Sequence, residues 1–195
     1  DHAELNKLLS TSIANRFDAY NIKKILEVII DAKKNGLSEK SLLNKFKEGL
    51  AKRVDERLIV EVLLKEAENL KIVKNMLKGN FIAEVSFEQD IIVDSLMEGL
   101  NNGVPQDSLS EVITRGAREG KRLQEVAEVS AEMGNLSLKA YELGLSEQEV
   151  NEVFSKAVAS RSGIDGICED IQDTLIAAAV AKMNLATRNS SGSSS

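Results

Sequence analysis

Apolar residues recur along the chain at spacings of three and four residues, which is the period of an amphipathic α-helix rather than of a strand. In one segment Ile22, Ile25 and Ile29 fall on the same side of such a helix. The pattern therefore predicts an all-α fold, a compact or slightly curved array of about eight or nine helices. A break is expected at Gly134-Asn135. The expected helical segments are 3–17, 22–34, 39–50, 55–78, 87–101, 106–118, 121–133, 136–143, 147–159 and 164–186.

A stretch that begins with glycine occurs three times in degenerate form. The copies read GLSEKSLLNKFKEGLAKRV from Gly36, GVPQDSLSEVITRGAREGKRL from Gly103 and GLSEQEVNEVFSKAVASRSGI from Gly144. Counted from each glycine, apolar residues fall at the same offsets, and these offsets follow the period of a helix. One such offset is occupied by Phe46, Ile113 and Phe154.

Each copy is predicted to contain a turn between two helices. The glycine ends the upstream helix at a position that favours a positive φ. Ser38, Pro105 and Ser146 then stand where the next helix begins, and each of these residue types is suited to that position. We therefore predict three degenerate helix-turn-helix repeats, near 22–54, 90–122 and 136–164.

The first copy, GLSEKSLLNKFKEGLAKRVDERLIVEVL, resembles a motif of uncharacterised, exported bacterial all-helical proteins. That motif has the form GL[PS]-x3-L-x2-K-x2-EGLAK-x-V. The likeness covers Gly36 to about Leu70 and is looser in the later copies. The resemblance implies a helical architecture and a periplasmic or secreted protein, with a cytoplasmic location as the alternative. It implies no activity and no catalytic residue.

Composition adds bounds to this interpretation. With 195 residues, of which 43% are hydrophobic and 29% charged, the chain is an ordinary globular sequence. We expect one helical domain over 1–188 and a flexible Ser/Gly tail over 189–195. The net charge of −6 argues against nucleic acid as a partner, because binding a phosphate backbone needs a concentrated positive surface. No apolar run approaches the ~20 residues of a transmembrane helix. The chain begins at Asp1 without a methionine, which suggests a removed leader.

Few residues offer chemistry. His2 is the only histidine and lies at the terminus, so histidine-based nucleophilic sites and ferritin-like metal sites are not expected. Cys168 is the only cysteine and is interpreted as a buried thiol. We expect no cofactor and no metal. Carboxylates share helix faces in two rows, for which a solvated face is the simpler interpretation. The rows are Glu125, Glu128 and Glu132, and Asp165, Glu169 and Asp173.

Cations gather where each glycine-led helix is expected to end. Two interpretations are open. Positive side chains favour helix C-termini because the carbonyl ends of the dipole lie there. Alternatively, the cations form one edge that binds an anionic partner. The residues of this edge are Lys52, Arg53, Arg115, Arg118, Lys121, Arg122, Lys156 and Arg161.

Repetition without a catalytic constellation favours a non-enzymatic helical scaffold that binds another protein or a second copy of itself through its grooves or its final helix. The final helix, with the run TLIAAAVAKMNLA, is expected to be buried within the chain, and a partner surface is the alternative. A second hypothesis is a carrier that binds a small apolar or anionic ligand between helices. A third is an enzyme that works by Glu or Lys acid–base chemistry.

Overall fold

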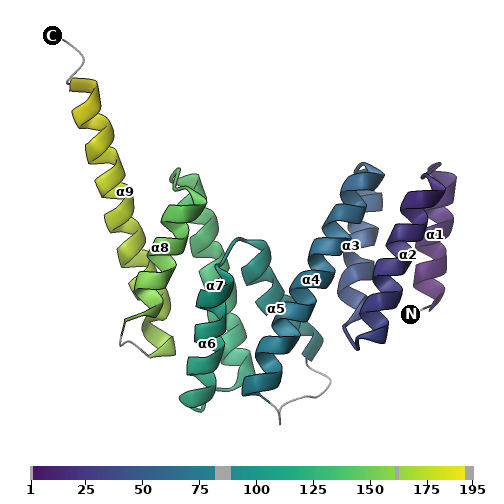
Figure 1. Cartoon of the computed structure of the whole chain (residues 1–195), viewed down its shortest axis with the longest axis horizontal. Helices are drawn as coiled ribbons and strands as arrows, with labels where there is room; N and C mark the ends of the chain where they lie inside the picture. The colour runs from purple at the N-terminus through teal and green to yellow at the C-terminus, as the bar shows by residue number, and fades with distance from the viewer. Residues whose placement is uncertain (1, 82–88, 161–162, 192–195) are drawn as a thin grey trace. The chain divides into compact units, whose positions relative to one another are not determined.

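The computed structural model describes residues 2–81, 89–160 and 163–191. Over these ranges the chain is all-α, with nine α-helices, one short 3-10 helix and no strand (Figure 1). The all-α fold that the apolar period predicts is confirmed. The elements are α1 (His2–Ala14), α2 (Ala19–Lys34), α3 (Glu39–Ala51), α4 (Glu56–Asn80), α5 (Gln89–Asn101), α6 (Gln106–Arg118), α7 (Leu123–Glu142), α8 (Glu147–Val158), η1 (Ile164–Gly166) and α9 (Ile167–Ser191).

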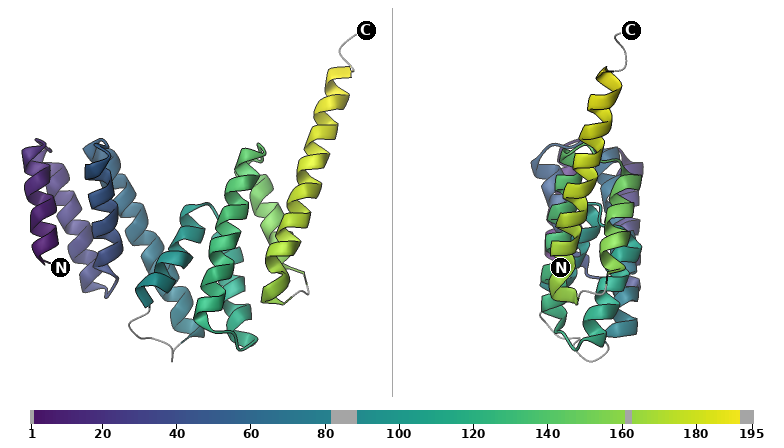
Figure 2. Two further views of the ribbon diagram at one scale, coloured as in Figure 1. Left: turned by 180° about the vertical axis from the view of Figure 1, so that it is seen from behind. Right: turned by 90° about the vertical axis from the view of Figure 1, so that its left-hand side faces the viewer.

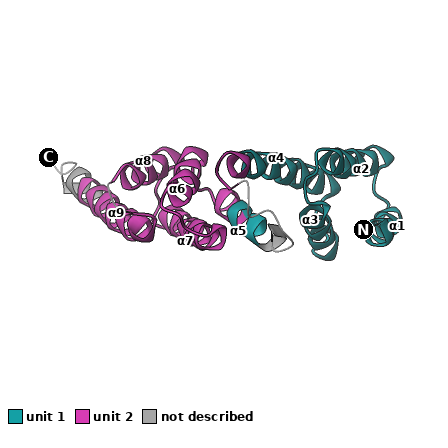
Figure 3. Ribbon diagram, turned by 90° about the horizontal axis from the view of Figure 1, so that it is seen from below, with its two compact units in different colours: residues 1–75, 87–97 teal, residues 76–86, 98–195 magenta. Residues whose placement is uncertain are grey.

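The chain divides into two compact units (Figure 3). The first comprises Asp1–Asn75 and Phe87–Met97, and the second comprises Met76–Ser86 and Glu98–Ser195. The boundaries fall inside α4 and α5, so each of these helices contributes to both units. The single domain expected over 1–188 stays a prediction.

In the first unit α3 packs against both α1 and α2. Seen along the helices, α1 and α3 lie in one row and α2 and α4 in another (Figure 3). The apolar faces that the sequence indicates meet between these rows, which is where such faces escape water. The fully buried side chains of this core include Ile25, Leu42, Phe46, Leu63 and Val73.

The second unit contains α6, α7, α8, η1 and α9. Here α6 packs against α7 and α8, and α9 packs against α7 and α8 (Figure 2). The 3-10 helix η1 joins α8 to α9 and contacts α6, α7 and α9. The fully buried side chains of the second unit's core include Leu109, Ile113, Val126, Met133, Phe154 and Ile171.

Among the described residues, six helix ends share one hydrogen-bond pattern. In each, a backbone N–H donates to the carbonyl five residues earlier, and the residue before that N–H has a positive φ. This is the Schellman ending, which satisfies carbonyls that the helix itself leaves unpaired. The left-handed residues are Arg16 (φ 62°), Gly36 (φ 62°), Arg53 (φ 54°), Gly103 (φ 89°), Gly120 (φ 71°) and Gly144 (φ 78°).

The three glycine-led segments have the same local geometry. Each glycine has a positive φ, and α3, α6 and α8 begin three residues later. Phe46, Ile113 and Phe154 are all completely buried in these helices. Of the three N-caps, Ser146 alone uses its side chain, accepting from the N–H of Glu149 at 3.3 Å. The tandem repeat itself stays a prediction.

The expected break at Gly134-Asn135 is wrong, because α7 continues through both residues. Gly134 is buried, and a Cβ atom there would lie 3.3 Å from the Cα of Gly99 and 3.2 Å from the side-chain nitrogen of Asn102. Its role is therefore a close approach between α7 and the end of α5, both parts of the second unit.

Several helix boundaries also differ from the expected ones: α1, for example, ends at Ala14 and not at residue 17. α2 begins at Ala19, before the expected residue 22, because the Asp18 carboxylate accepts from the N–H of Tyr20 at 2.7 Å and caps the helix. α9 continues to Ser191, past the expected start of the Ser/Gly tail at residue 189. Residues 192–195 of that expected tail lie outside the described residues.

The left-handed conformation of Arg53 leads to a stability prediction. An L-residue with a side chain pays roughly 1–2 kcal/mol in this region, whereas glycine does not. We expect Arg53→Gly to raise the free energy of unfolding by about 0.5–1 kcal/mol in urea titrations. The matched control is Lys52→Gly, since Lys52 has right-handed helical dihedrals, φ −82° and ψ −2°, and should lose stability. An Arg53→Gly protein less stable than the wild type would contradict this account.

Candidate functional site

The candidate interaction surface is the C-terminal half of α9. This helix has 25 residues, whereas its neighbour α8 has 12, and α9 extends past the end of α8 (Figures 1 and 2). Its first half is packed, since Ile167, Ile171 and Leu175 are at most 4% exposed. From residue 176 to 185 no residue is buried. The expectation that the final helix is buried within the chain is therefore wrong for its second half, because α8 is too short to cover it.

Three large apolar side chains lie on one face of this half of the helix. Ile176, Val180 and Met183 follow one another at spacings of four and three, which places them on one side of a helix. They are 52%, 51% and 69% exposed. We call these three residues the α9 stripe. Apolar side chains grouped in this way on a surface are typical of interaction sites.

An ion pair holds the exposed half of α9 in place. The ammonium group of Lys182 donates to the carbonyl of Gly144 at 2.7 Å and to the carboxylate of Glu149 at 2.8 Å. That carboxylate also accepts from the N–H of Ser146 at 2.7 Å. The hydrogen bond from Lys182, followed by those from Ser146, lowers the pKa of Glu149 to about 2. The stripe is thus presented by an anchored helix and not by a loose end.

A corresponding lysine occurs in the first unit. Lys74 donates to the carbonyls of Asn35 and Gly36, the latter at 3.0 Å. The sequence separation from Gly36 to Lys74 is 38 residues, the same as from Gly144 to Lys182. In both places a lysine from the second α-helix after the turn binds the carbonyl of a left-handed glycine, where a helix terminus is negative. The sequence around each glycine predicts neither contact, because the lysine lies 38 residues further along the chain.

The structure uses several of the cations that the sequence groups into one edge. Arg115 donates to the carbonyls of Val158 and of Ser160, the latter at 3.4 Å, and so binds the C-terminus of α8. This contact agrees with the helix-terminus interpretation. Other members are ion-paired with carboxylates: Lys52 with Glu48 at 2.5 Å, Lys121 with Asp165 at 2.6 Å and Arg122 with Glu125 at 3.1 Å.

Among the described residues, the remaining cations make no ion pair or hydrogen bond that bears on a common edge. Arg53, Arg118 and Lys156 are exposed, and Arg161 lies outside the described residues. Lys52 and Arg53 belong to the first unit and the other members to the second. The anionic-partner edge therefore stays a prediction.

The metal-ligating side chains, the cysteine and the apolar runs of the described residues give three further observations. Within the described residues no group of three or more His, Cys, Asp or Glu side chains could hold a metal ion. This finding covers the two carboxylate rows noted in the sequence. Cys168 is buried, and its thiol donates to the carbonyl of Val129 at 3.8 Å. Burial, followed by the nearby Glu132 carboxylate, raises the pKa of this thiol to about 12. In the part of the chain that the structure describes, none of the helices has the length and apolar character of a membrane span.

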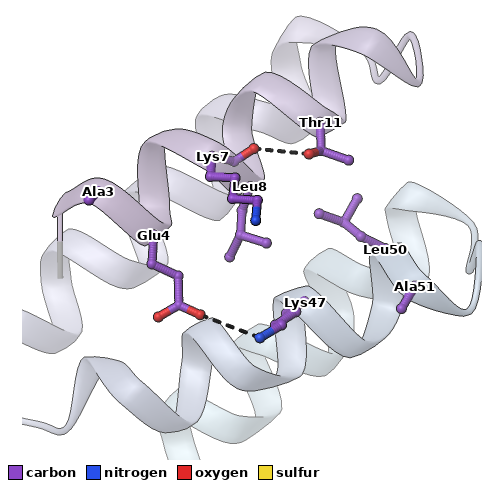
Figure 4. A pocket seen from close by; sticks show the side chains of 8 residues that line it. All are labelled: Ala3, Glu4, Lys7, Leu8, Thr11, Lys47, Leu50 and Ala51. Carbon is purple, nitrogen blue, oxygen red and sulfur yellow. Dashed lines mark hydrogen bonds and ion pairs between the residues drawn. The ribbon is translucent and has the colours of Figure 1, made fainter.

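A groove in the first unit is a second feature of interest. It lies between α1 and α3 and has a volume of about 560 Å3 (Figure 4). Leu8 and Leu50 point toward each other across it, and the carboxylate of Glu4 lies 3.9 Å from the ammonium group of Lys47. The sequence gives no signal for this groove, because α1 and α3 are brought together only by the tertiary fold.

The state of Cys168 leads to a prediction about its reactivity. Since the thiolate is the reactive form, a buried thiol whose pKa is raised to about 12 should react slowly. We expect the folded protein to react with a disulfide reagent at pH 8 far more slowly than free cysteine, and the urea-unfolded protein to react at the free rate. Equal rates for the folded and unfolded protein would overturn the assignment.

The Lys182–Glu149 pair leads to a pH dependence. The folded pKa of Glu149, about 2, lies below its ordinary value of 4.5, so the pair stabilises the protein above pH 4.5 and the effect is lost as pH falls toward 2. Glu149→Gln should therefore lower the urea midpoint at neutral pH, with a difference from wild type that shrinks in acid. Glu152→Gln, an exposed change on the same helix, is the control. A difference independent of pH would argue against the pair.

Comparisons with known proteins give no independent assignment. No family model, no curated protein and no solved structure matches the chain. The family resemblance of the glycine-led motif therefore stays an expectation from the sequence. Function has to be argued from the surfaces described above.

Proposed function

We propose that this protein is a non-enzymatic helical scaffold that binds another protein, or a second copy of itself, through the α9 stripe. The observation that carries the proposal is the exposure of Ile176, Val180 and Met183 on one face of an anchored helix. The periplasmic or secreted location implied by the motif remains part of the proposal.

Corresponding positions elsewhere in the chain make this stripe unusual. The three positions of the stripe are counted from Gly144, which opens the third glycine-led segment. The same offsets from Gly36 and Gly103 fall on positions in α4 and α7 that are also at least partly exposed. Five of these six residues are polar or charged, and Ile72 is the exception. The α4 residues are Glu68, Ile72 and Asn75, and the α7 residues are Asn135, Lys139 and Glu142. At these positions the face is thus apolar in α9 and mostly polar in α4 and α7, which supports an interaction surface on α9.

The size of the stripe indicates what kind of interface it can serve. Burying a large apolar side chain completely gains about 1.5–3 kcal/mol, so three half-exposed ones gain about 2–5 kcal/mol together. Association costs an estimated ~4–15 kcal/mol in lost freedom of motion. The stripe alone therefore supports only weak binding, and we infer that it is the apolar centre of a larger contact.

The proposal of a non-enzymatic role rests on the reactive side chains of the chain and their surroundings. The chain has one histidine, at its second residue, and its one cysteine is a buried thiol with a raised pKa. Catalysis by Glu or Lys would need a site where such groups converge with a perturbed pKa. The carboxylates with a lowered pKa, such as Glu149 and Glu125, accept hydrogen bonds at helix starts, which is a structural role.

Self-association gives the first test of the proposal. Sedimentation velocity over a wide range of protein concentration is expected to show a reversible increase in mass for the wild type, reduced in Val180→Glu. The matched control is Ala181→Glu, which adds the same charge to α9 at an exposed position off the stripe. Both variants should fold, because neither position is buried.

A partner other than a second copy is tested by crosslinking. A photo-crosslinking residue is placed at position 180 or 181, in cells that produce the protein naturally, and position 180 should capture a partner that position 181 does not. If the wild type is monomeric at every concentration and neither position captures a protein, the proposal is contradicted.

A further inference from the structure

The groove between α1 and α3 combines an apolar floor with positive charge at its rim. Leu8 and Leu50 are 7% and 9% exposed and face each other across it (Figure 4). Ala3 and Ala51 extend this apolar surface along the two helices. A volume of about 560 Å3 lies within the range of small-molecule sites, roughly 300–1,000 Å3.

Two lysines supply the charge. Lys7 comes from α1 and Lys47 from α3, and both line the groove. The carboxylate of Glu4 is 3.9 Å from the ammonium group of Lys47, which is too long for a hydrogen bond and leaves donors of that group open to another acceptor. The hydroxyl of Thr11 is already used, since it donates to the carbonyl of Lys7 at 2.9 Å. The groove thus carries more positive than negative charge in a chain whose net charge is −6.

From this juxtaposition we propose that the groove binds an amphipathic anion, namely a small carboxylate with an unbranched aliphatic chain. The chain lies on Leu8 and Leu50, and the carboxylate accepts hydrogen bonds from Lys7 and Lys47. A purely polar anion would leave the apolar floor unused, and a neutral apolar molecule would add no acceptor for the two ammonium groups. This site is in the first unit and the α9 stripe is in the second, so it is independent of the scaffold role.

The binding test uses dodecanoate, below the concentration at which it forms micelles, as the probe in isothermal titration of the full chain. One saturable site is expected, with much weaker binding of dodecanol and none of acetate. These two ligands separate the contributions of the carboxylate and of the chain without any change to the protein. Absence of saturable dodecanoate binding would overturn the proposal, and so would equal binding of dodecanol.

Variants locate the site. Replacing both lysines, Lys7→Ala with Lys47→Ala, removes two ion pairs with the carboxylate, and each exposed ion pair contributes about 0.2–1 kcal/mol. Dodecanoate binding should therefore weaken by roughly 2-fold to 25-fold. The matched control, Lys40→Ala with Lys65→Ala, removes the same charge from exposed positions of the first unit outside the groove. Ala51→Glu adds a negative charge at the rim and should also weaken binding. Equal loss in the groove and control variants would overturn the assignment to this groove.

Discussion

The fold depends on how its helices end. At six helix ends in the part of the chain that the structure describes, one residue lies in the left-handed region and the next N–H donates to the carbonyl five residues earlier. The helix therefore stops and the chain turns back within a few residues. The following helix can then place its apolar face against its predecessor. Complete burial of Phe46, Ile113 and Phe154, one in each glycine-led segment, is the result. Lys74 and Lys182 reinforce two of these turns by binding the glycine carbonyls from a later helix.

Local signals explain why much of this could be predicted from the sequence. The bounds of α6 agree with the expected 106–118, because Gly103 and Pro105 mark the turn before it. Arg16 and Arg53 adopt the same left-handed conformation without such a signal, since the pattern expects glycine there. Gly134 shows the opposite failure. Its sequence resembles a helix end, but its partner is the backbone of Gly99, which only the tertiary fold brings near.

The candidate sites were less predictable for the same reason. The spacing of Ile176, Val180 and Met183 is visible in the sequence, but the side that faces solvent depends on α8 being half as long as α9. The grouped cations are visible in the sequence as well, but the carbonyls and carboxylates that they bind are not. Arg115 binds the end of α8, more than forty residues away along the chain, and a single sequence cannot show such a contact. The groove between α1 and α3 also depends on packing that joins distant segments.

Two surfaces of the described residues are the candidate sites, an apolar helix face in one unit and a cationic apolar groove in the other. The central claim is that the α9 stripe is an interface. Hydrogen exchange of residues 176–185, followed as protein concentration rises or as a crosslinked partner is added, tests it most directly. The account expects hydrogen exchange of residues 176–185 to slow, while hydrogen exchange of the α4 residues Glu68, Ile72 and Asn75 stays unchanged. Exchange that stays equally fast in both would contradict it.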